Sequence, residues 1–174
     1  MAKIYETESE DMLNENTSKD MYLTFRLNNE EYGFDISHVT EIVGIQPITL
    51  IPESANYIKG IINLRGKIIP VIDLRLKFNR TEKAYDERTC IIVLAYGGTD
   101  VGFIVDNVSE VVTLKEDQVI PLPSYGSELR NNYVKNIGKA ANGIKLLLDC
   151  SRILGKNELE MIEGLLTNKS DDKN

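Results

Sequence analysis

The sequence predicts a mainly β protein made of two small barrels in tandem, followed by one short helix. The first observation is an internal repeat: Gly33-Phe34 returns 69 residues later as Gly102-Phe103, and after Pro52 the copies match at a spacing of 76, as in Tyr57 and Tyr133. The second is a series of short alternating apolar segments separated by Asn and Gly turns, which is typical of strands and hairpins. The third is that one segment near the carboxyl end has a convincing helical pattern.

Each copy contains about five expected strands. In the first copy they cover residues 21–27, 32–36, 38–43, 60–64 and 67–72, with turns at Asn28-Asn29 and Arg65-Gly66. In the second they cover residues 90–96, 101–105, 107–112, 133–139 and 144–148, with turns at Gly97-Gly98 and Asn142-Gly143. So small a sheet must close or pack to hide its edges, which favours barrels. Pro70 lacks a backbone donor, so we expect it at a strand edge or a bulge.

The helix is expected over residues 157–166. Asn157 is the cap, and Leu159, Ile162 and Leu165 share one face. The chain then divides into a disordered acidic tail over 1–20, a first subdomain of about 21–88, a second of about 89–156, the helix, and a tail over 167–174. Because an isolated core is marginal below about 70–80 residues, the two subdomains are expected to share buried surface.

Composition and charge narrow the class of protein. The formal charge is −7, and residues 1–20 contribute −4 of it because they hold six acids and two bases. No basic stripe is available to neutralise phosphates, which argues against nucleic acid as a partner. The chain has no apolar run near the roughly 20 residues of a membrane helix, and its acidic start does not fit a secretory signal. A cytoplasmic protein without direct membrane insertion is therefore expected.

The residues that usually carry chemistry are sparse. His38 is the single histidine, and it has no ligand cluster at metal-binding spacing. Cys90 and Cys150 lie among apolar residues and are interpreted as small core side chains. No phosphate-binding or hydrolase motif is present, so no catalytic, metal or cofactor residues are predicted. Carboxylates that distant segments could still assemble are Asp73, Asp106, Asp149, Glu41 and Glu110. Asp73 and Asp149 each follow an apolar strand, which favours capping roles.

Two residues near the second hairpin of the first copy favour an interaction site. Arg65 places a five-donor guanidinium at a hairpin tip, where a small turn residue would serve the backbone equally well. It could be a solvated charge, an internal partner of Glu41, or a contact for another protein. Gly60 lies in a strand, where glycine indicates either a bulge or the close approach of another backbone.

These residues carry a family resemblance. The run from Tyr57 to Gly66, YIKGIINLRG, continues as IPVIDLR over residues 69–75, and EYGFDI over residues 31–36 precedes Val39-Thr40-Glu41-Ile42. The pattern resembles the CheW-like domains of bacterial chemotaxis, from about residue 21 to residue 166. The resemblance implies two five-stranded, SH3-like barrels related by a pseudo-twofold axis. It also implies a scaffold that couples the cytoplasmic hairpin tips of chemoreceptors to the regulatory domain of the histidine kinase CheA within signalling arrays.

The resemblance also implies a receptor-facing surface. Ile36 and Val39 would line an apolar groove, Glu41 and Arg65 would form a polar pair at its rim, and Gly60 would permit close packing. At Val43 some members of the family have arginine, so a charge-based receptor preference does not carry over. The motifs assign no kinase-facing residues. Two alternatives stay open here: a CheW-like docking module for a kinase of another pathway, and, in a different class, a small β-barrel enzyme built on the scattered carboxylates.

Overall fold

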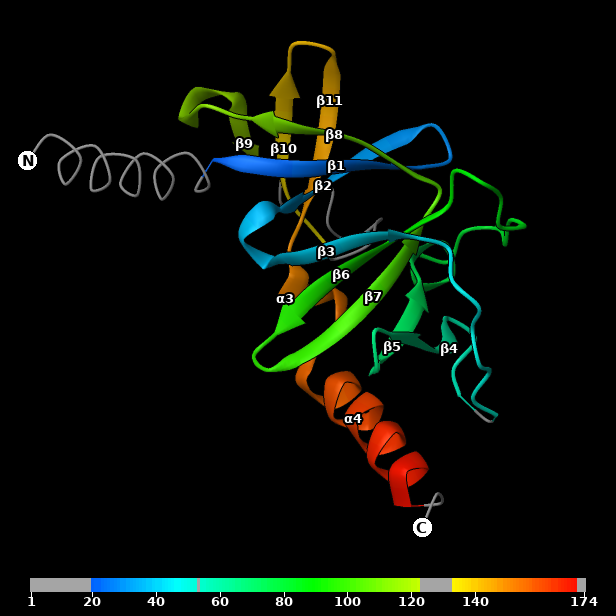
Figure 1. Cartoon of the computed structure of the whole chain (residues 1–174). Coiled ribbons are helices and arrows are strands. Elements are labelled where there is room, and N and C mark those ends of the chain that lie inside the picture. The colour runs from blue at the N-terminus through cyan, green and yellow to red at the C-terminus, as the bar shows by residue number, and fades with distance from the viewer. Residues whose placement is uncertain (1–19, 53, 123–132, 172–174) are drawn as a thin grey trace, which may run out of the picture.

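The computed structural model describes residues 20–52, 54–122 and 133–171 and contains two β-sheets (Figure 1). The first sheet has the strand order β8-β1-β2-β11-β10-β9. Its strands are β1 (Met21–Leu27), β2 (Glu30–Asp35), β8 (Asn107–Thr113), β9 (Val119–Pro121), β10 (Val134–Ala140) and β11 (Gly143–Leu148). The second sheet has the order β3-β6-β7-β5-β4. Its strands are β3 (Val39–Gly44), β4 (Ile58–Leu64), β5 (Lys67–Asp73), β6 (Cys90–Tyr96) and β7 (Thr99–Val105).

Both sheets close through the segment that follows an outer strand. After β3 the chain reaches Thr49, which forms an antiparallel bridge with Ile61 of β4, the strand at the other end of the sheet order. In the first sheet β9 follows β8 and pairs with β10, where Ile120 lies opposite Ile137. Each sheet is therefore a small closed barrel, which removes most of its free edges.

The two copies of the repeat exchange their first hairpins. The hairpin β1-β2 belongs to the first copy and pairs with strands of the second, while β6-β7 of the second copy pairs with strands of the first. The pairings match: Leu23 lies opposite Val111 in one sheet, and Ile92 opposite Ile42 in the other. The boundary near residue 88 thus separates the two copies of the repeat in the sequence. It does not separate the two barrels, because each barrel contains strands from both sides of this boundary. A pseudo-twofold axis relates the two barrels.

The main core lies between the two sheets. Phe34 and Phe103, which are repeat partners, are both fully buried, with their ring centroids 5.9 Å apart. Other partners continue the pattern on either side, such as Ile72 with Leu148, both in the same cluster. The expected sharing of buried surface follows from the exchange, because neither copy encloses a core with its own strands. A second cluster fills the interior of the β3–β7 barrel: Ile62, Ile69, Val71, Ile91, Val93 and Ile104.

Pro70 is one place where the expectation was wrong. It lies in β5, which has neighbours on both sides, β4 and β7. The pairing with β7 begins only at Val71, opposite Gly102, while Pro70 itself lies opposite Ile61 of β4. Proline is tolerated in this inner strand because no β7 residue is in register with it to require a backbone donor.

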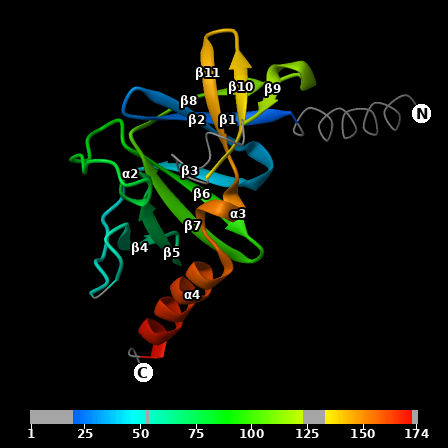
Figure 2. The ribbon, with the colours of Figure 1, turned by 180° about the vertical axis from the view of Figure 1, so that it is seen from behind.

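Short helices end both repeats, and a longer one completes the chain. The helices are α2 (Leu74–Lys77), α3 (Cys150–Ile153) and α4 (Lys156–Asp171), with 3-10 turns η1 (Ile36–His38) and η2 (Glu116–Gln118). Helix α4 buries Ile162 in the main core and projects from the β3–β7 barrel (Figures 1 and 2). It extends beyond the expected residue 166 because the polar residues that follow contain neither glycine nor proline. No described helix is long and apolar enough to cross a membrane.

Candidate interaction site

The turn between β4 and β5 brings Arg65 against Glu41 on β3. A guanidinium nitrogen of Arg65 forms an ion pair with Oε1 of Glu41. The Arg65 side chain stays 75% exposed, whereas that of Glu41 is 27% exposed. Because β3 and β4 stand at opposite ends of the sheet order, the pair lies across the closure of the barrel. Exposed pairs of this kind contribute at most about 1 kcal/mol to stability, so a role in folding is a weak reason for the presence of this pair.

The backbone at Arg65 is in an unfavourable conformation for its residue type. Its φ is +54° and that of Gly66 is +86°, as in the hairpin turns that prefer Asn-Gly. The other non-glycine residues with positive φ in the described chain are Asn28 and Asn79, and asparagine tolerates this region best. An arginine here costs about 1 kcal/mol. The guanidinium is thus held at the hairpin tip against local preference, as expected for a functional side chain.

Gly60 has an internal reason to be glycine. Its φ is +145°, and a Cβ built on it would lie 2.0 Å from the carbonyl oxygen of Thr49. The register of β4 against β5 shifts between Ile58 and Gly60, so both sequence interpretations, the bulge and the close approach, apply. The approaching backbone is that of Thr49, in the bridge that closes the barrel. The glycine therefore shapes the wall beside the Arg65 turn.

A bulge in β3 separates the predicted apolar and polar positions. Val39 lies opposite Leu94 of the main core, while Glu41 lies opposite Val93 of the barrel interior. Since residues opposite each other share a face, Val39 and Glu41 point to different faces of the sheet. Ile42 shares the face of Val39 and is 44% exposed. Sequence analysis missed Ile42, and only the register shift at the bulge identifies it.

Ile36 lies in the η1 turn immediately before β3. The side chain of Asp35 fixes this turn by accepting a hydrogen bond from the backbone N–H of Ser37 at 3.0 Å. Ile36 and Val39 are both half-buried, and Val39 packs against the main core. The structure therefore places one predicted apolar residue just before β3 and the other at its first position, on the strand that also carries Glu41.

The carboxylates considered for catalysis have structural partners. Asp73 caps α2 by accepting from the N–H of Leu76, and it also accepts from the Tyr85 hydroxyl at 2.7 Å. Burial and this hydrogen bond raise the pKa of Tyr85. Asp149 caps α3 through the N–H of Ser151. The capping roles expected for both aspartates are confirmed.

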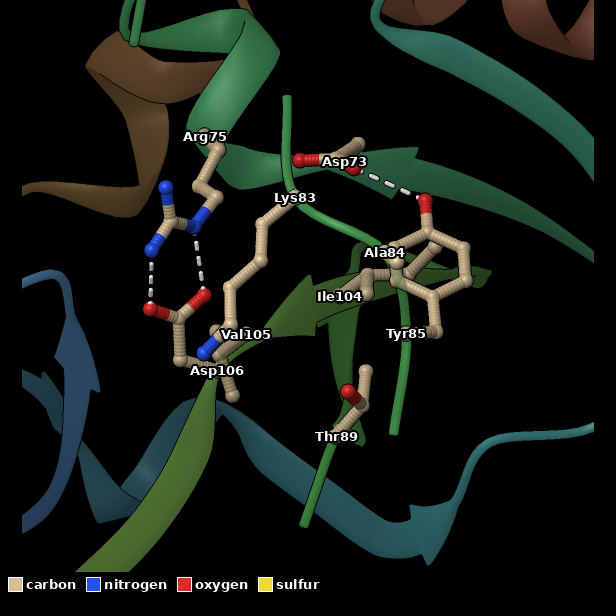
Figure 3. A pocket seen from close by; sticks show the side chains of 9 residues that line it. All are labelled: Asp73, Arg75, Lys83, Ala84, Tyr85, Thr89, Ile104, Val105 and Asp106. Atoms are coloured by element: carbon tan, nitrogen blue, oxygen red, sulfur yellow. Dashed lines mark hydrogen bonds and ion pairs between the residues drawn. The ribbon is translucent and has the colours of Figure 1, made fainter. Parts of the chain in front are cut away.

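Asp106 belongs to a compact polar cluster (Figure 3). Its two carboxylate oxygens accept from Nε of Arg75 at 2.6 Å and from a terminal nitrogen of Arg75 at 2.5 Å. Burial alone would raise the pKa of Asp106, but the hydrogen bonds from Arg75 and from the N–H of Asn28 outweigh it and lower the pKa. The adjoining cavity has a volume of about 10 Å³, room for roughly one water molecule. This geometry suits a structural tie between barrels better than a substrate site.

The pseudo-twofold axis gives the Arg65 site a counterpart on the other barrel. Glu110, the repeat partner of Glu41, accepts a hydrogen bond at 2.6 Å from the side-chain amide of Asn142. Asn142 lies in the β10–β11 turn, which is equivalent to the β4–β5 turn that carries Arg65. The arrangement is repeated, but a neutral amide replaces the cation. The two barrels therefore present related surfaces of different charge.

Comparison with known proteins identifies the family. The family model described as CheW-like domain matches residues 21–158. The chain belongs to the CheW-like domain family. It is 40% identical over 144 residues to the chemotaxis protein CheW of Klebsiella aerogenes, covering 83% of this chain and 87% of that relative. It is 34% identical over 134 residues to the CheW of Bacillus subtilis, covering 77% and 86%.

A solved CheW structure agrees with the fold. The scaffolding protein TtCheW from Thermoanaerobacter tengcongensis matches with a TM-score of 0.73 and 35% identity, over 80% of this chain and 95% of that one. The predicted fold class, two SH3-like barrels with a short carboxyl-terminal helix, is thereby confirmed. The predicted role as a chemotaxis coupling scaffold is confirmed at the level of the family, and the relatives favour neither the other-pathway module nor the enzyme.

Proposed function

We propose that this chain acts in the cytoplasm without catalysis, by holding a CheA-type histidine kinase at the tips of chemoreceptors in membrane arrays. The proposal rests on the CheW-like family match and on the related scaffold structure. The five carboxylates considered for catalysis serve as helix caps, ion-pair partners or hydrogen-bond acceptors, as Asp73 and Asp106 do. Signals would pass through contacts between folded surfaces.

The receptor would bind along the β3 edge. The observation that carries this assignment is Arg65, an exposed arginine in a left-handed turn. The helical receptor tip would pack on Ile36 and Val39, with Ile42 extending the apolar strip, while the Arg65–Glu41 pair meets polar groups at the rim. Gly60 would act indirectly, by allowing the barrel wall beside this turn to form.

The kinase would dock on a different surface of the barrels. The regulatory domain of CheA is itself CheW-like, so its barrels could pack on those of this chain through heterologous contacts. An apolar side chain remains exposed on the other barrel, since Val111 of β8 is 44% exposed. Exposed apolar positions of this kind are suitable for packing between related barrels.

Calorimetric titration tests the two contacts separately. One titrant is the isolated regulatory domain of a CheA-type kinase from the same organism, and the other is a fragment containing a receptor hairpin tip. The proposal predicts saturable binding of both, and loss of receptor binding but not kinase binding in Arg65→Asn. If receptor binding of Arg65→Asn matches that of the unaltered chain, the site assignment is wrong. If neither partner binds the folded chain, the coupling role is wrong.

A further inference from the structure

Packing on both sides of the β3 bulge requires one extra residue but does not fix its position. Val39 packs against the main core, and Val43 packs against the interior of the β3–β7 barrel. Val39 lies opposite Leu94 and Val43 lies opposite Ile91, so residues 39–43 of β3 oppose only residues 91–94 of β6. The strand must therefore accommodate one unpaired residue between these two valines. Packing at the two ends does not decide which residue it is.

The position of the extra residue decides the direction in which Glu41 points. In the structure Thr40 is the extra residue, and Glu41 lies opposite Val93. If the extra residue came after Glu41, Glu41 would lie opposite Ile92, on the other face of the sheet. Ile42 occupies that place and is 44% exposed, so the surroundings there do not exclude a carboxylate. A bulge displaced in this way would break the ion pair that Glu41 forms across the barrel closure.

The hydroxyl of Thr40 stabilises the bulge in its observed place. Its Oγ1 donates a hydrogen bond to the backbone carbonyl oxygen of Val93 at 3.1 Å. Val93 is also the residue opposite Glu41, so this bond forms at the point where the register shifts. In regular pairing a strand side chain stands roughly perpendicular to the sheet, which does not favour a bond to the carbonyl of the neighbouring strand. The bond therefore favours the register in which Thr40 is the extra residue.

The other barrel repeats both the bulge and the hydroxyl contact. The register of β1 against β8 shifts between Thr24 and Phe25. On β8 the residues in register with them are Glu110 and Val108, which leaves Ser109 as the extra residue. The hydroxyl of Thr24 donates to the backbone carbonyl oxygen of Glu110 at 2.8 Å and accepts from the backbone N–H of Glu110 at 3.2 Å. A threonine hydroxyl thus bonds to the backbone of the opposite strand at this bulge as well.

The two barrels supply this hydroxyl from different strands. Ser109 is the repeat partner of Thr40, and Thr24 is the repeat partner of Val93. Where β1 has a threonine, β6 has a valine, which carries no hydroxyl. Thr40 makes the bond from the bulged strand instead. Because two equivalent bulges form such a bond by different routes, we conclude that the bond helps to fix the position of each bulge.

We propose that Thr40 is a positioning residue for receptor recognition, an inference that rests on the proposed receptor site along β3. Its hydroxyl selects the bulge that directs Glu41 to Arg65. The same bulge leaves Val39 and Ile42 together on the other face. A receptor that requires this arrangement binds only the molecules in which Thr40 is the extra residue, so the apparent affinity falls with their fraction.

Thr40→Val tests the inference because it removes the hydroxyl and keeps the branched shape of the side chain. Valine favours strands, so the variant is expected to fold. In calorimetry its affinity for a receptor tip fragment should fall about three- to tenfold, as expected for the loss of one hydrogen bond. Its affinity for the kinase regulatory domain should be unchanged. Thr40→Ser keeps the hydroxyl and should bind the receptor like the unaltered chain, as should Thr113→Val, the same change at an exposed threonine of β8.

NMR of the isotope-labelled full chain reports the register directly. Cross-strand NOEs between Glu41 and Val93 should weaken in Thr40→Val, and NOEs that pair Glu41 with Ile92 should appear. The inference is overturned if this register is unchanged, if receptor affinity is unchanged, or if Thr40→Ser loses as much affinity as Thr40→Val. Absence of receptor binding by the unaltered chain would overturn the proposed function and this inference with it. An unchanged register in Thr40→Val, with normal receptor binding by the unaltered chain, would overturn this inference alone.

Discussion

Arg65→Asn should separate recognition from stability. Arginine with φ of +54° is strained by about 1 kcal/mol, and asparagine relieves most of that strain. The change also removes the ion pair to Glu41, which contributes at most about 1 kcal/mol because Arg65 is 75% exposed. The two effects oppose each other, so the net change in stability should lie within about 0.5 kcal/mol. The melting temperature should then move by no more than about 2 °C.

Receptor binding should respond very differently. A hydrogen bond to a charged group commonly contributes about 1.5 kcal/mol or more, which corresponds to a loss of affinity of at least about tenfold. Calorimetry with a receptor tip fragment measures the affinity, and thermal unfolding measures the stability. Lys67→Asn is the matched control. Lys67 is an exposed cation in the same hairpin as Arg65, but it pairs with Asp100 instead of Glu41. The reasoning is refuted if Arg65→Asn unfolds several degrees lower yet binds the receptor normally.

Three further changes test the packing. Phe103→Ala should cost about 3–5 kcal/mol and weaken binding to every partner, because this side chain lies at the centre of the main core; an unchanged melting temperature would contradict the core assignment. Gly60→Ala should cost several kcal/mol, since its Cβ would overlap the Thr49 carbonyl, and hydrogen exchange should locate the damage in β4. Asp106→Asn should cost roughly 3 kcal/mol by leaving Arg75 without its carboxylate partner. The folded-state pKa of Asp106 is lowered, so ionised Asp106 stabilises the fold above its unfolded-state pKa, and this stabilisation is lost as the pH falls through the folded-state pKa. The denaturation midpoints of the mutant and the unaltered chain should therefore converge at acid pH. A constant difference between the two midpoints would exclude this linkage.

The strands and turns could be predicted because their signals are local. Alternation of apolar residues located nearly every strand, and Asn28 and Gly66 adopt the positive φ expected of their turns. The exchange of hairpins could not be predicted in this way. Both copies have nearly the same apolar pattern, so β1 could pair equally well with β3 or with β8, and only long-range packing around Phe34 and Phe103 selects the second.

The interaction site was predictable only where its signal in the sequence is local. Arg65 stands out in the sequence because its residue type conflicts with its turn, and the structure pairs it with Glu41 as one of the expected alternatives. Ile42 gave no such signal, because the alternation assigns it to the face opposite Val39. The bulge in β3 reverses that assignment, and bulges leave little trace in a strand without glycine.

The most direct test of the coupling role is whether both partners bind one chain at the same time. The kinase regulatory domain is titrated calorimetrically into the full chain, first alone and then after saturation with the receptor tip fragment. The account predicts one-to-one binding in both titrations, because the receptor site on β3 and the kinase-docking surface are separate. Loss of kinase binding in the presence of the receptor fragment, with all components folded, would contradict it.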